Sequence, residues 1–597
     1  MKLTDYIAKR LAGHGIRHVF MLTGGGAMHL NHSLGNCEGI ETIFNLHEQA
    51  CAIAAEGYAR VSNKPAVVNV TTGPGGLNTL TGVMGQWTDS VPVLYLSGQV
   101  KFQTTIHSCP ELGLRQLGDQ ENDIVSVVKP ITKYAALITD PNSVKAEIDK
   151  ALYIATHGRP GPVWLDIPMD VQGAVIDEDE LLEFDPDDFR DFSDHEKIKE
   201  QASEIISLIK KSERPVLVAG HGIRISGGVK VFREIMSRLK IPVLTTFNGI
   251  DLIETDNEYY TGKIGVQGDR AGNFALQNAD LAIFLGTRNN LRQVTYNWDE
   301  FAEKAKKVVV DIDPAELKKK YVTPDIAVNA DVRILMENIL DALDEESAGN
   351  FKDWVEWCTD KKKRYPVVLD EYKYTGDKVQ PYYFVEELTR SLNEGAVVVA
   401  GNATASIALM QAGIIKKSQR MFSNSGCASM GYGLPAAIGA CIANEKKDTI
   451  CITGDGSFQM NIQELSTVRY MKLPLKIFYL NNDGYISIRQ TQKNFFDGKI
   501  TGSDTKSGLF FPDLAEVCKA YGIKYKKINN HEGLTENISD VLNYEGAVLC
   551  EVMLQDDYVY APKVSSAKDR DGNIYTKPID DMFPFLPRDE YYRNKIK

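Results

Sequence analysis

The chain is predicted to be an α/β protein made of three doubly wound parallel-sheet domains. Its 597 residues are too many for one hydrophobic core, so three or four domains are expected. Short apolar segments alternate with segments of helical period, which is typical of β-α-β units. The alternation falls into three blocks that polar stretches separate. The sequence therefore predicts three successive domains of the same general class.

The first block predicts an N-terminal domain over residues 1–175. It opens on an amphipathic helix that leads into a strand, and it closes near the segment "GRPGPVWLDIP". An acidic stretch with few large apolar residues follows at 176–195 and predicts a linker. After the first strand, buried parallel strands are expected at 41–46, 65–72, 91–98 and 158–168.

The second and third blocks repeat the pattern. A central domain is expected over residues 196–345, a linker over 346–375 and a C-terminal domain over 376–556. The tail, 557–597, is too aromatic for plain disorder and is expected to pack against the rest. Strands of the central domain are expected at 214–222, 241–247, 279–288 and 307–314. Strands of the C-terminal domain are expected at 396–402, 449–456, 475–483 and 547–554.

The composition excludes several classes of partner. The net charge of −13 argues against a surface for nucleic acid or for an anionic membrane. The nine cysteines include no C-x-x-C pair, which is typical of free thiols in a reducing compartment. No segment has the apolar length of a signal peptide core or of a membrane span. We therefore expect a cytoplasmic protein with no nucleic-acid or membrane partner.

A carboxylate stands on a glycine turn in the third block. Asp455 lies in "GDGS" directly after a buried strand, and the next strand runs into Asn482. A right-handed βαβ connection places both strand ends at the same edge of a parallel sheet. A carboxylate and an amide carbonyl are hard oxygen ligands, the set that Mg²⁺ or Ca²⁺ prefers. The spacing therefore predicts a divalent metal site between these two residues.

The glycines beside Asp455 favour a diphosphate ligand. They let backbone N–H groups and the start of the next helix approach a diphosphate that the metal would bridge. A dinucleotide-binding turn or an ordinary β-turn is the competing interpretation. However, "GDGSFQMN" lacks the third glycine of the dinucleotide fingerprint, and the chain contains no G-x-x-x-x-G-K-[ST] loop. The paired "NNDGY" at the next strand end favours the metal and diphosphate interpretation.

"GDGS" followed by a helix and then by "NN" resembles the diphosphate motif of thiamine-diphosphate enzymes. The order of the blocks and the segments "HEQACAIAAEGYAR", "TTGPGGLNTLTG", "VPVLYLSGQV", "GRPGPVWLDIP" and "MGYGLPAAIGA" resemble the acetolactate synthase group over almost the whole chain. The resemblance implies thiamine diphosphate as cofactor, with Mg²⁺ bound by the Asp455 and Asn482 side chains and the Gly484 carbonyl. Further cofactor contacts are implied at Gly25, Gly26, Pro74, Asn78, Asn402, Gly454, Gly456, Ser457, Tyr485 and Ile486.

The resemblance also implies catalytic roles. Glu48 aligns with the carboxyl group that hydrogen-bonds the cofactor's aminopyrimidine and so promotes removal of the C2 proton. Without the resemblance, Glu48 is an acid in the first turn of a helix, where the helix dipole favours it. Met430 aligns with the large apolar residue that wedges between the two cofactor rings, and simple core packing is its alternative role. Gln99 is implied to face the reacting carbon.

The second block resembles the flavin-binding domain of acetolactate synthases, where FAD is usually structural. The segments "GVQGDRAGN" and "GTRNNLRQ" depart from the usual text of that domain. A domain that keeps the fold without the flavin is therefore the competing interpretation. The positions implied to contact FAD are Arg159, Gly220, Gly286, Arg288 and Asp311.

The implied activity is that of a carboligase. Such an enzyme decarboxylates pyruvate and transfers the two-carbon unit to a second carbonyl compound. A simple 2-oxo-acid decarboxylase and a flavin-linked oxidoreductase of the pyruvate oxidase type are alternatives. A non-catalytic nucleotide-binding protein is disfavoured, because Glu48 and the Asp455–Asn482 pair are all retained. In this family the first block of one subunit faces the third block of another, so a homodimer or homotetramer is expected.

The acceptor side departs from the family. A Trp in the helix after "NN" favours a small apolar acceptor in acetolactate synthases, and the aligned residue here is Thr491. Arg489 and Gln492 lie on the same turn and add polar groups. A roomier, hydrogen-bonding pocket suits a polyhydroxylated acceptor such as a keto-sugar. If this helix is only surface, Phe495 or the tail would supply the aromatic contact instead.

Overall fold

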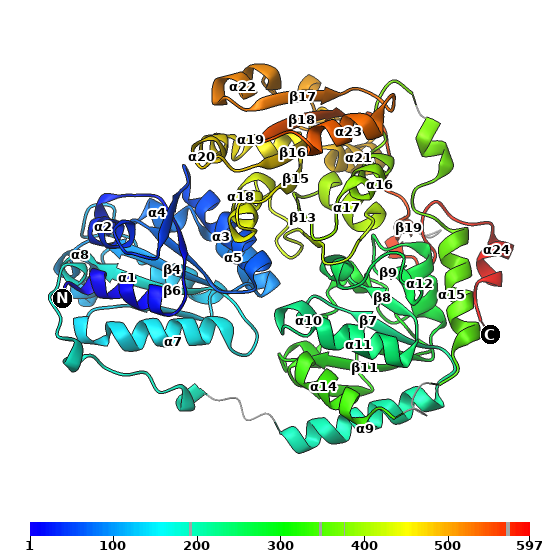
Figure 1. The fold of residues 1–597 in the computed structure, drawn as a ribbon, viewed down its shortest axis with the longest axis horizontal. Coiled ribbons are helices and arrows are strands. Elements are labelled where there is room, and N and C mark those ends of the chain that lie inside the picture. The colour runs from blue at the N-terminus through cyan, green and yellow to red at the C-terminus, as the bar shows by residue number, and fades with distance from the viewer. Residues whose placement is uncertain (190–193, 345–348, 375, 569–573, 597) are drawn as a thin grey trace.

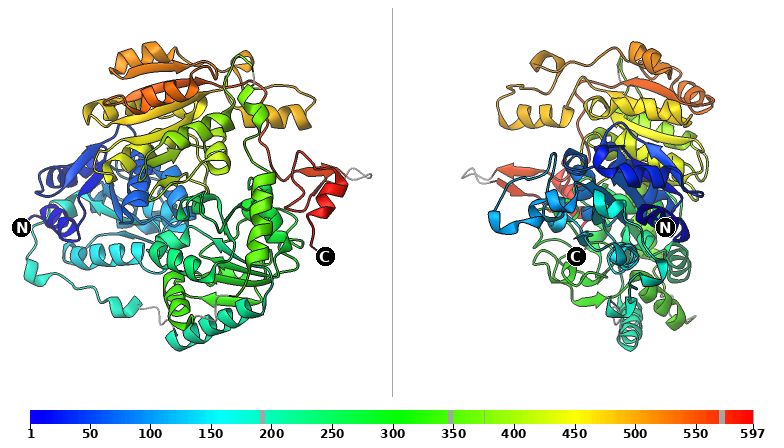
Figure 2. Two further views of the ribbon diagram at one scale, coloured as in Figure 1. Left: turned by 45° about the vertical axis from the view of Figure 1, so that its right-hand side comes forward. Right: turned by 90° about the vertical axis from the view of Figure 1, so that its left-hand side faces the viewer.

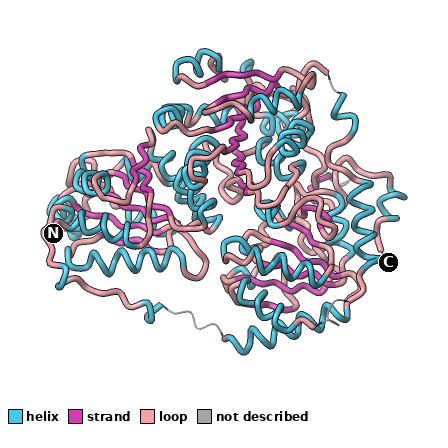
Figure 3. The backbone as a smooth tube through the Cα atoms, viewed as in Figure 1, coloured by secondary structure: helices cyan, strands magenta, loops and turns pink. Residues whose placement is uncertain are grey.

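Three parallel sheets organise the chain. The computed structural model describes residues 1–597 except 190–193, 345–348, 375, 569–573 and 597. The three large sheets have six strands each. Figure 1 shows the N-terminal domain in blue, the central domain in green and the C-terminal domain in yellow and orange around a common centre. Figure 3 shows the same sheets in magenta with helices on either side. The predicted α/β class with three doubly wound sheets is confirmed.

The N-terminal sheet has the strand order β2-β1-β3-β4-β6-β5, and all neighbouring strands are parallel. Its strands are β1 (His18–Met21), β2 (Glu41–Phe44), β3 (Ala66–Val70), β4 (Val93–Gln99), β5 (Tyr134–Leu137) and β6 (Val163–Pro168). One face is covered by α1 (Leu3–Gly13), α2 (Met28–Gly35) and α7 (Val144–Thr156). The other face is covered by α3 (Glu48–Ser62), α5 (Leu80–Asp89) and α6 (Ile124–Val128). The short helices are α4 (Pro74–Leu77) and α8 (Met169–Gln172).

The central sheet has the order β12-β11-β10-β7-β8-β9, which reverses between β7 and β10. Its strands are β7 (Pro215–Ala219), β8 (Val243–Thr245), β9 (Tyr260–Lys263), β10 (Leu281–Leu285), β11 (Lys306–Asp311) and β12 (Ile326–Asn329). One face is covered by α9 (His195–Lys211), α11 (Val229–Leu239) and α14 (Val332–Ala342). The other face is covered by α12 (Arg270–Asn278) and α15 (Lys352–Arg364). The short helices are α10 (Gly222–Ile225) and α13 (Leu291–Val294).

The C-terminal sheet, in the order β14-β13-β15-β16-β18-β17, repeats the topology of the N-terminal sheet. Its strands are β13 (Val397–Ala400), β14 (Arg420–Phe422), β15 (Thr449–Gly454), β16 (Leu475–Asn481), β17 (Lys524–Ile528) and β18 (Val548–Met553). One face is covered by α16 (Pro381–Ser391), α17 (Thr404–Ala412) and α23 (Leu534–Leu542). The other face is covered by α18 (Gly433–Ala443), α20 (Leu465–Tyr470) and α22 (Leu514–Tyr521). The remaining helices are α19 (Asp455–Gln459) and α21 (Ile486–Phe495).

The N- and C-terminal domains share one buried core across their boundary. Helices α3 and α18 pack against each other there, and each places a glycine on the backbone of the other. A Cβ on Gly57 would stand 2.1 Å from the carbonyl oxygen of Ala436. A Cβ on Gly439 would stand 1.7 Å from the carbonyl oxygen of Ala54. Two glycines therefore set how closely the two domains approach.

The tail leaves the C-terminal domain and packs on the central domain, as Figure 2 shows in red beside green. Arg270 and Asn273 of α12 donate to the carbonyl oxygens of Met582 and Ile579, respectively. The tail carries an antiparallel pair, β19 (Ser566–Lys568) and β20 (Ile574–Thr576), and then α24 (Arg588–Arg593). This packing agrees with the aromatic character of the segment.

Five strands of the large sheets were not predicted: β5, β9, β12, β14 and β17. All five lie at a sheet edge, where one side of the strand has no neighbour and the apolar run is short. In β17, for example, three of five residues are lysines, and one residue is buried. Separately, none of the helices in the described part of the chain is both long enough and apolar enough to cross a membrane.

The contact between α3 and α18 makes Gly439→Ala destabilising. Alanine is normally the better helix former by about 1 kcal/mol. Here the methyl group would overlap the Ala54 carbonyl oxygen, and overpacking of this kind costs about 1–3 kcal/mol. We expect a lower midpoint in thermal unfolding. The control is Gly35→Ala, also in a helix, where a Cβ would meet no atom within 4 Å. Equal midpoints for the two variants would contradict the packing argument.

Candidate active site

A first group of predicted site residues meets at the carboxyl edge of the N-terminal sheet. Glu48 begins α3 shortly after β2 and is only 8% exposed. The side-chain amide of Asn78 donates to its carboxylate at 2.9 Å. Helix α4, which begins at Pro74, brings the backbone of Gly75 against the same carboxylate. The structure therefore assembles one carboxyl group, one amide and one glycine turn here.

The turn after β1 lies at the same edge. The N–H of Gly26 donates to the hydroxyl of Thr71 at 3.0 Å. A Cβ on Gly26 would stand 2.0 Å from the hydroxyl oxygen of Thr72, so this position requires glycine. Gly25, the neighbouring residue, begins the short 3₁₀ turn that follows. Both glycines thus bring bare backbone to the end of β3.

Gln99 ends β4 and is buried beside Asp166. Its amide nitrogen donates to the Asp166 carboxylate at 3.0 Å and to the carbonyl oxygen of Asn122 at 2.9 Å. Burial raises the pKa of Asp166 to about 7. The side-chain oxygen of Gln99 accepts the N–H of Val100 at 3.0 Å. Because both polar ends bond within the chain, contact of Gln99 with a reacting carbon stays a prediction.

A second group meets at the carboxyl edge of the C-terminal sheet. Asp455 begins α19 after β15, and Asn482 follows the adjacent strand β16. One carboxylate oxygen of Asp455 accepts the N–H groups of Asn482 at 3.1 Å and of Gly484 at 2.8 Å. The other oxygen accepts the N–H of Gly456 at 2.7 Å. The two residues that the sequence pairs across 27 positions are therefore neighbours in space.

The donor set at this edge fits a hard divalent cation. Among the described residues, the side-chain oxygen of Asn482 is buried and has no hydrogen-bond partner. A buried polar atom without a partner costs free energy unless a ligand satisfies it. Burial raises the pKa of Asp455 to about 6, and a bound cation would favour the ionised carboxylate. The side chains of Asp455 and Asn482, with the backbone of Gly484 beside them, therefore suit Mg²⁺.

The predicted phosphate-binding residues surround the same turn. A Cβ on Gly454 would meet open space, whereas one on Gly456 would stand 2.0 Å from the ring of Tyr485. The first glycine therefore leaves room beside the backbone, and the second lets the aromatic ring lie against it. Tyr485 precedes α21, whose first residue is Ile486.

Met430 lies in the segment between β14 and α18, close to this turn in the fold. The hydroxyl of Ser457 accepts the N–H of Gly431 at 3.0 Å, next to Met430. The side chain of Asn402, which follows β13, is 3.4 Å from the carbonyl oxygen of Ala428. The segment that carries the predicted wedge residue therefore contacts the predicted phosphate-binding residues at the carboxyl edge of the C-terminal sheet.

The sequence interpretation missed the part that the tail plays here. Tyr558 and Tyr560 both hydrogen-bond the hydroxyl of Thr404, the latter at 2.8 Å. The amide nitrogen of Asn482 also lies 3.3 Å from the hydroxyl of Tyr558. The tail therefore contacts the turn after β16 and orients the Asn482 amide. Two tyrosines in "YVYAP" were the available signal, but nothing in their spacing indicates what they contact.

All three predicted acceptor residues bond within the chain, including Thr491, whose hydroxyl donates to the carbonyl oxygen of Ser487 at 3.1 Å. The guanidinium of Arg489 donates to the carbonyl oxygens of Asn482 at 2.6 Å and of Asp483 at 2.8 Å, so it supports the turn after β16. Gln492 donates to the loop after α21 at 2.9 Å. Thr491 is exposed on α21. Contact of these residues with an acceptor stays a prediction.

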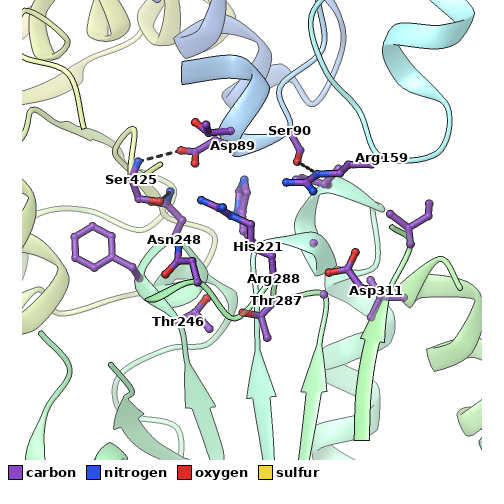
Figure 4. Close-up of a pocket in the computed structure, with 18 of the residues that line it drawn as sticks. Asp89, Ser90, Arg159, His221, Thr246, Asn248, Thr287, Arg288, Asp311 and Ser425 are labelled. Atoms are coloured by element: carbon purple, nitrogen blue, oxygen red, sulfur yellow. Dashed lines mark hydrogen bonds between the residues drawn. The ribbon is translucent and has the colours of Figure 1, made fainter. Parts of the chain in front are cut away.

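A cavity of about 350 Å³ opens at the carboxyl ends of the central strands (Figure 4). Ligands of doubly wound sheets bind where the strand order reverses, and this sheet reverses between β7 and β10. Gly220 follows β7, and a Cβ there would stand 2.3 Å from the carbonyl oxygen of Gly286, which follows β10. The opposite wall comes from the N-terminal domain through Asp89, Ser90 and Arg159.

Four of the predicted flavin contacts line this cavity: Arg159, Gly286, Arg288 and Asp311. Gly220, the fifth, is not among the residues that line the cavity. Burial raises the pKa of the Asp311 carboxyl to about 6, and an acid at such a strand end binds a ribose in dinucleotide folds. The cavity volume is in the range of small-molecule sites. The cavity therefore fits a nucleotide-type ligand, and FAD as its occupant stays a prediction.

Three family models match the chain in the order of its three sheets. The model described as "Thiamine pyrophosphate enzyme, N-terminal TPP binding domain" matches residues 1–121. The model of the central domain of these enzymes matches residues 202–343. The model of their C-terminal TPP binding domain matches residues 400–552 and so includes the Asp455 turn. The two TPP-binding models thus fall on the two sheets that carry the site residues.

Relatives match along nearly the whole chain. "Acetolactate synthase large subunit" of Cyanidium caldarium is 32% identical over 578 residues, which cover 94% of this chain and 94% of the relative. The protein of the same name from Lactococcus lactis subsp. lactis (strain IL1403) is 32% identical, with 96% of each chain covered. "Acetolactate synthase 3, chloroplastic" of Brassica napus is 32% identical, with 95% of this chain and 85% of the relative covered. The chain therefore belongs to the acetolactate synthase family of thiamine-pyrophosphate-dependent enzymes.

Proposed function

We propose that this enzyme is a carboligase that decarboxylates pyruvate and transfers the two-carbon unit to a second carbonyl compound. The observation that carries the proposal is a pair of half-sites. One joins Glu48 to Asn78. In the other, Asp455 accepts the backbone N–H of Asn482, and the side-chain oxygen of Asn482 has no hydrogen-bond partner in the described part of the chain. The relatives named acetolactate synthase support pyruvate as the donor. Their names do not favour a simple decarboxylase or a pyruvate oxidase.

Each residue has a defined task in this proposal. Thiamine diphosphate supplies an electron sink for the decarboxylation when it is bound. Asp455, Asn482 and the Gly484 carbonyl would hold Mg²⁺, which neutralises the diphosphate charge. Glu48, oriented by Asn78, would exchange a proton with the aminopyrimidine ring.

Met430 and Gln99 would act on geometry rather than on charge. The first would keep the two cofactor rings folded, and the second would face the reacting substrate from the end of β4. Holding reactants in one orientation removes a large part of the entropic barrier. Neither residue needs to change its protonation state for this task.

We propose that the two half-sites complete one active site across two subunits. Large apolar side chains are exposed in segments next to the residues of both half-sites, and exposed apolar surface is common at protein interfaces. A homodimer is then the minimum active unit, and a homotetramer contains two such units. The exposed residues are Met28, Phe44, Leu46 and Leu77 near Glu48, and Met460 near Asp455.

FAD is the proposed occupant of the central cavity, in a structural role. Its support is the set of Arg159, Arg288 and Asp311 around a strand-order reversal. A cytoplasmic location is proposed because all nine cysteines are unpaired.

The acceptor is proposed to be pyruvate or a keto-sugar. Thr491 stands where the family has a Trp, so a smaller, polar side chain is exposed at this position of α21. A pocket built from hydrogen-bonding groups discriminates strongly against analogues that leave those groups unpaired. A polyhydroxylated acceptor would exploit this pocket, whereas a second pyruvate would not need it.

Product analysis tests the function. With pyruvate, thiamine diphosphate and Mg²⁺, we expect a ligation product in the mass spectrum, either acetolactate or an adduct of an added aldehyde, ketone or keto-sugar. A keto-sugar that diverts the product from acetolactate would identify the acceptor class. Acetaldehyde as the sole product would indicate a decarboxylase, and acetate with a reduced electron acceptor would indicate an oxidase. Acetolactate formed with a low KM for pyruvate and no diversion would exclude the enlarged pocket.

Asp455→Ala is expected to abolish Mg²⁺-dependent binding of thiamine diphosphate. The variant removes the carboxylate that Asn482 and Gly484 surround, so the cation would lose its charged protein ligand. Isothermal titration calorimetry measures the cofactor affinity. The matched control is Asp448→Ala, at the other end of the same strand, where Asp448 pairs with Lys476. Unchanged cofactor affinity in Asp455→Ala would exclude the metal assignment.

Glu48→Gln is expected to retain the fold and the cofactor but to slow exchange of the cofactor's C2 proton. The amide keeps the hydrogen-bonding shape beside Asn78 and cannot exchange a proton. General acid–base catalysis contributes roughly 10²–10⁴-fold, and the exchange rate should fall on that scale in an NMR quench measurement. Glu41→Gln, on an exposed part of β2, is the control. Exchange at the wild-type rate would leave Glu48 as a helix-start acid only.

A further inference from the structure

Residues 423–432 connect β14 to α18 and carry Met430; we name this segment the wedge loop. Its anchors come from outside its own domain. Two carboxylates of the N-terminal domain, Glu56 and Asp89, accept hydrogen bonds from it, and Asn248 of the central domain supplies a third anchor. The position of Met430 therefore depends on parts of the chain that are remote in sequence.

Asp89 makes the most direct of these contacts. Its two carboxylate oxygens accept the N–H groups of Ser425 at 2.9 Å and of Gly426 at 3.0 Å. The guanidinium of Arg60 donates to the same carboxylate at 2.7 Å. The Asp89 side chain is 5% exposed and that of Arg60 is 1% exposed. Charge-assisted hydrogen bonds in a buried setting are stronger and shorter than neutral ones, so this carboxylate holds the backbone of the loop firmly.

Glu56, a second buried carboxylate, contacts the loop near both of its ends. Its carboxylate accepts the amide of Asn424 at 3.1 Å and the hydroxyl of Tyr432 at 3.0 Å. Arg60 donates to it at 2.9 Å and so bridges the two carboxylates. The oxygen of Asn424 in turn accepts the N–H groups of Cys427 and Ala428. Both ends of the loop are therefore fastened to one buried Glu56–Arg60–Asp89 unit.

Asp89 also faces the central cavity. It lines that cavity together with Ser425 and Asn248, and Figure 4 shows the Asp89–Ser425 contact at its upper edge. The amide of Asn248 donates to the carbonyl oxygen of Ser423 at 3.0 Å and to the hydroxyl of Ser425 at 3.1 Å. A ligand in the cavity would therefore touch the same groups that hold the wedge loop.

We propose that Asp89 is a positioning residue, which fixes Met430 through the wedge loop and connects it to the occupant of the central cavity. The inference rests on the proposed role of Met430 at the cofactor. The proposed connection gives a nucleotide in the central cavity a role in catalysis, although it binds far from the reacting atoms. A ligand that orders Asp89 and Ser425 would also order Met430. Such a coupling is reciprocal, so the cofactor and the cavity ligand would each strengthen the binding of the other.

The test uses Asp89→Asn in the full-length protein. An amide can still accept one N–H but presents its own NH₂ to the donors of Arg60, Ser425 or Gly426. We expect kcat to fall by roughly 10–100-fold, the scale of a small misplacement of a reacting group, with KM for pyruvate unchanged. Hydrogen exchange of the peptide that covers the wedge loop should become faster. Wild-type kcat together with wild-type exchange would overturn the proposal.

Two further variants separate the possible causes. Asp149→Asn, which faces Arg10 in the same domain and is remote from the loop, is the matched control. Met430→Ala combined with Asp89→Asn should lose no more activity than the stronger single variant, because both act through one side chain. Fully additive losses would overturn the proposed route. If Asp89→Asn does not fold, the test uses Asp89→Glu with the same expectations. This variant keeps the charge that faces Arg60 but displaces the carboxylate.

The connection to the cavity is tested with FAD as the probe. Binding of FAD to the wild type should slow exchange in the wedge loop and raise the affinity for thiamine diphosphate, by roughly 5–100-fold on the usual scale of such couplings. In Asp89→Asn this gain should fall towards onefold. FAD that binds without either effect overturns the connection, and FAD that does not bind overturns it together with the flavin proposal. Wild-type activity in Met430→Ala would instead exclude the wedge role, while the exchange data still decide whether Asp89 holds the loop.

Discussion

The close approach of α3 and α18 is the constraint on which the rest of the structure depends. These helices occupy equivalent places in two sheets of identical strand order, and each follows the second strand of its sheet. Gly57 and Gly439 make the contact reciprocal, since each lies on a carbonyl oxygen of the other helix. Glu48 stands at the start of one helix and the wedge loop leads into the other. Within one subunit, backbone packing therefore fixes the distance between Glu48 and the wedge loop. Backbone packing tolerates much less variation than contacts between long side chains.

Buried ion pairs then fix the orientation that the glycines leave free. Arg60 bridges Glu56 and Asp89 within the N-terminal domain, and both carboxylates continue into the C-terminal domain. Arg420 of β14 donates to Asp251 of the central domain at 2.6 Å. Buried pairs of this kind add little net stability, because desolvation offsets the attraction, but breaking one is costly. Their contribution is one defined arrangement of three domains, and the wedge loop lies where those domains meet.

The sequence predicted what short-range rules govern. Apolar runs located the central strands of all three sheets, and the βαβ spacing correctly predicted that Asp455 and Asn482 are neighbours at one sheet edge. Edge strands such as β17 were not predicted, because exposed strands lack the apolar run by which buried strands are recognised. The contact between Tyr558 and Asn482 was not predicted for a different reason. Tyr558 reaches Asn482 from a tail that lacks periodicity, and no local rule indicates which surface such a tail covers. The contact of Asp89 was not predicted either, because its partner Ser425 is 336 residues away in the sequence.

The duplicated topology also explains how one chain divides its chemistry. In the N-terminal sheet the turn after the second strand offers a carboxyl group, Glu48, at the start of α3, where it accepts the amide of Asn78. In the C-terminal sheet the turn after the third strand carries Asp455, the proposed metal ligand. A single domain with both carboxylates side by side would raise the pKa of one of them through repulsion. Glu48 and Asp455 instead lie on separate copies of the fold, so the proposed proton exchange and the proposed metal binding belong to different domains. In the proposed homodimer, a cofactor held by both half-sites would require the N-terminal domain of one subunit to meet the C-terminal domain of the other.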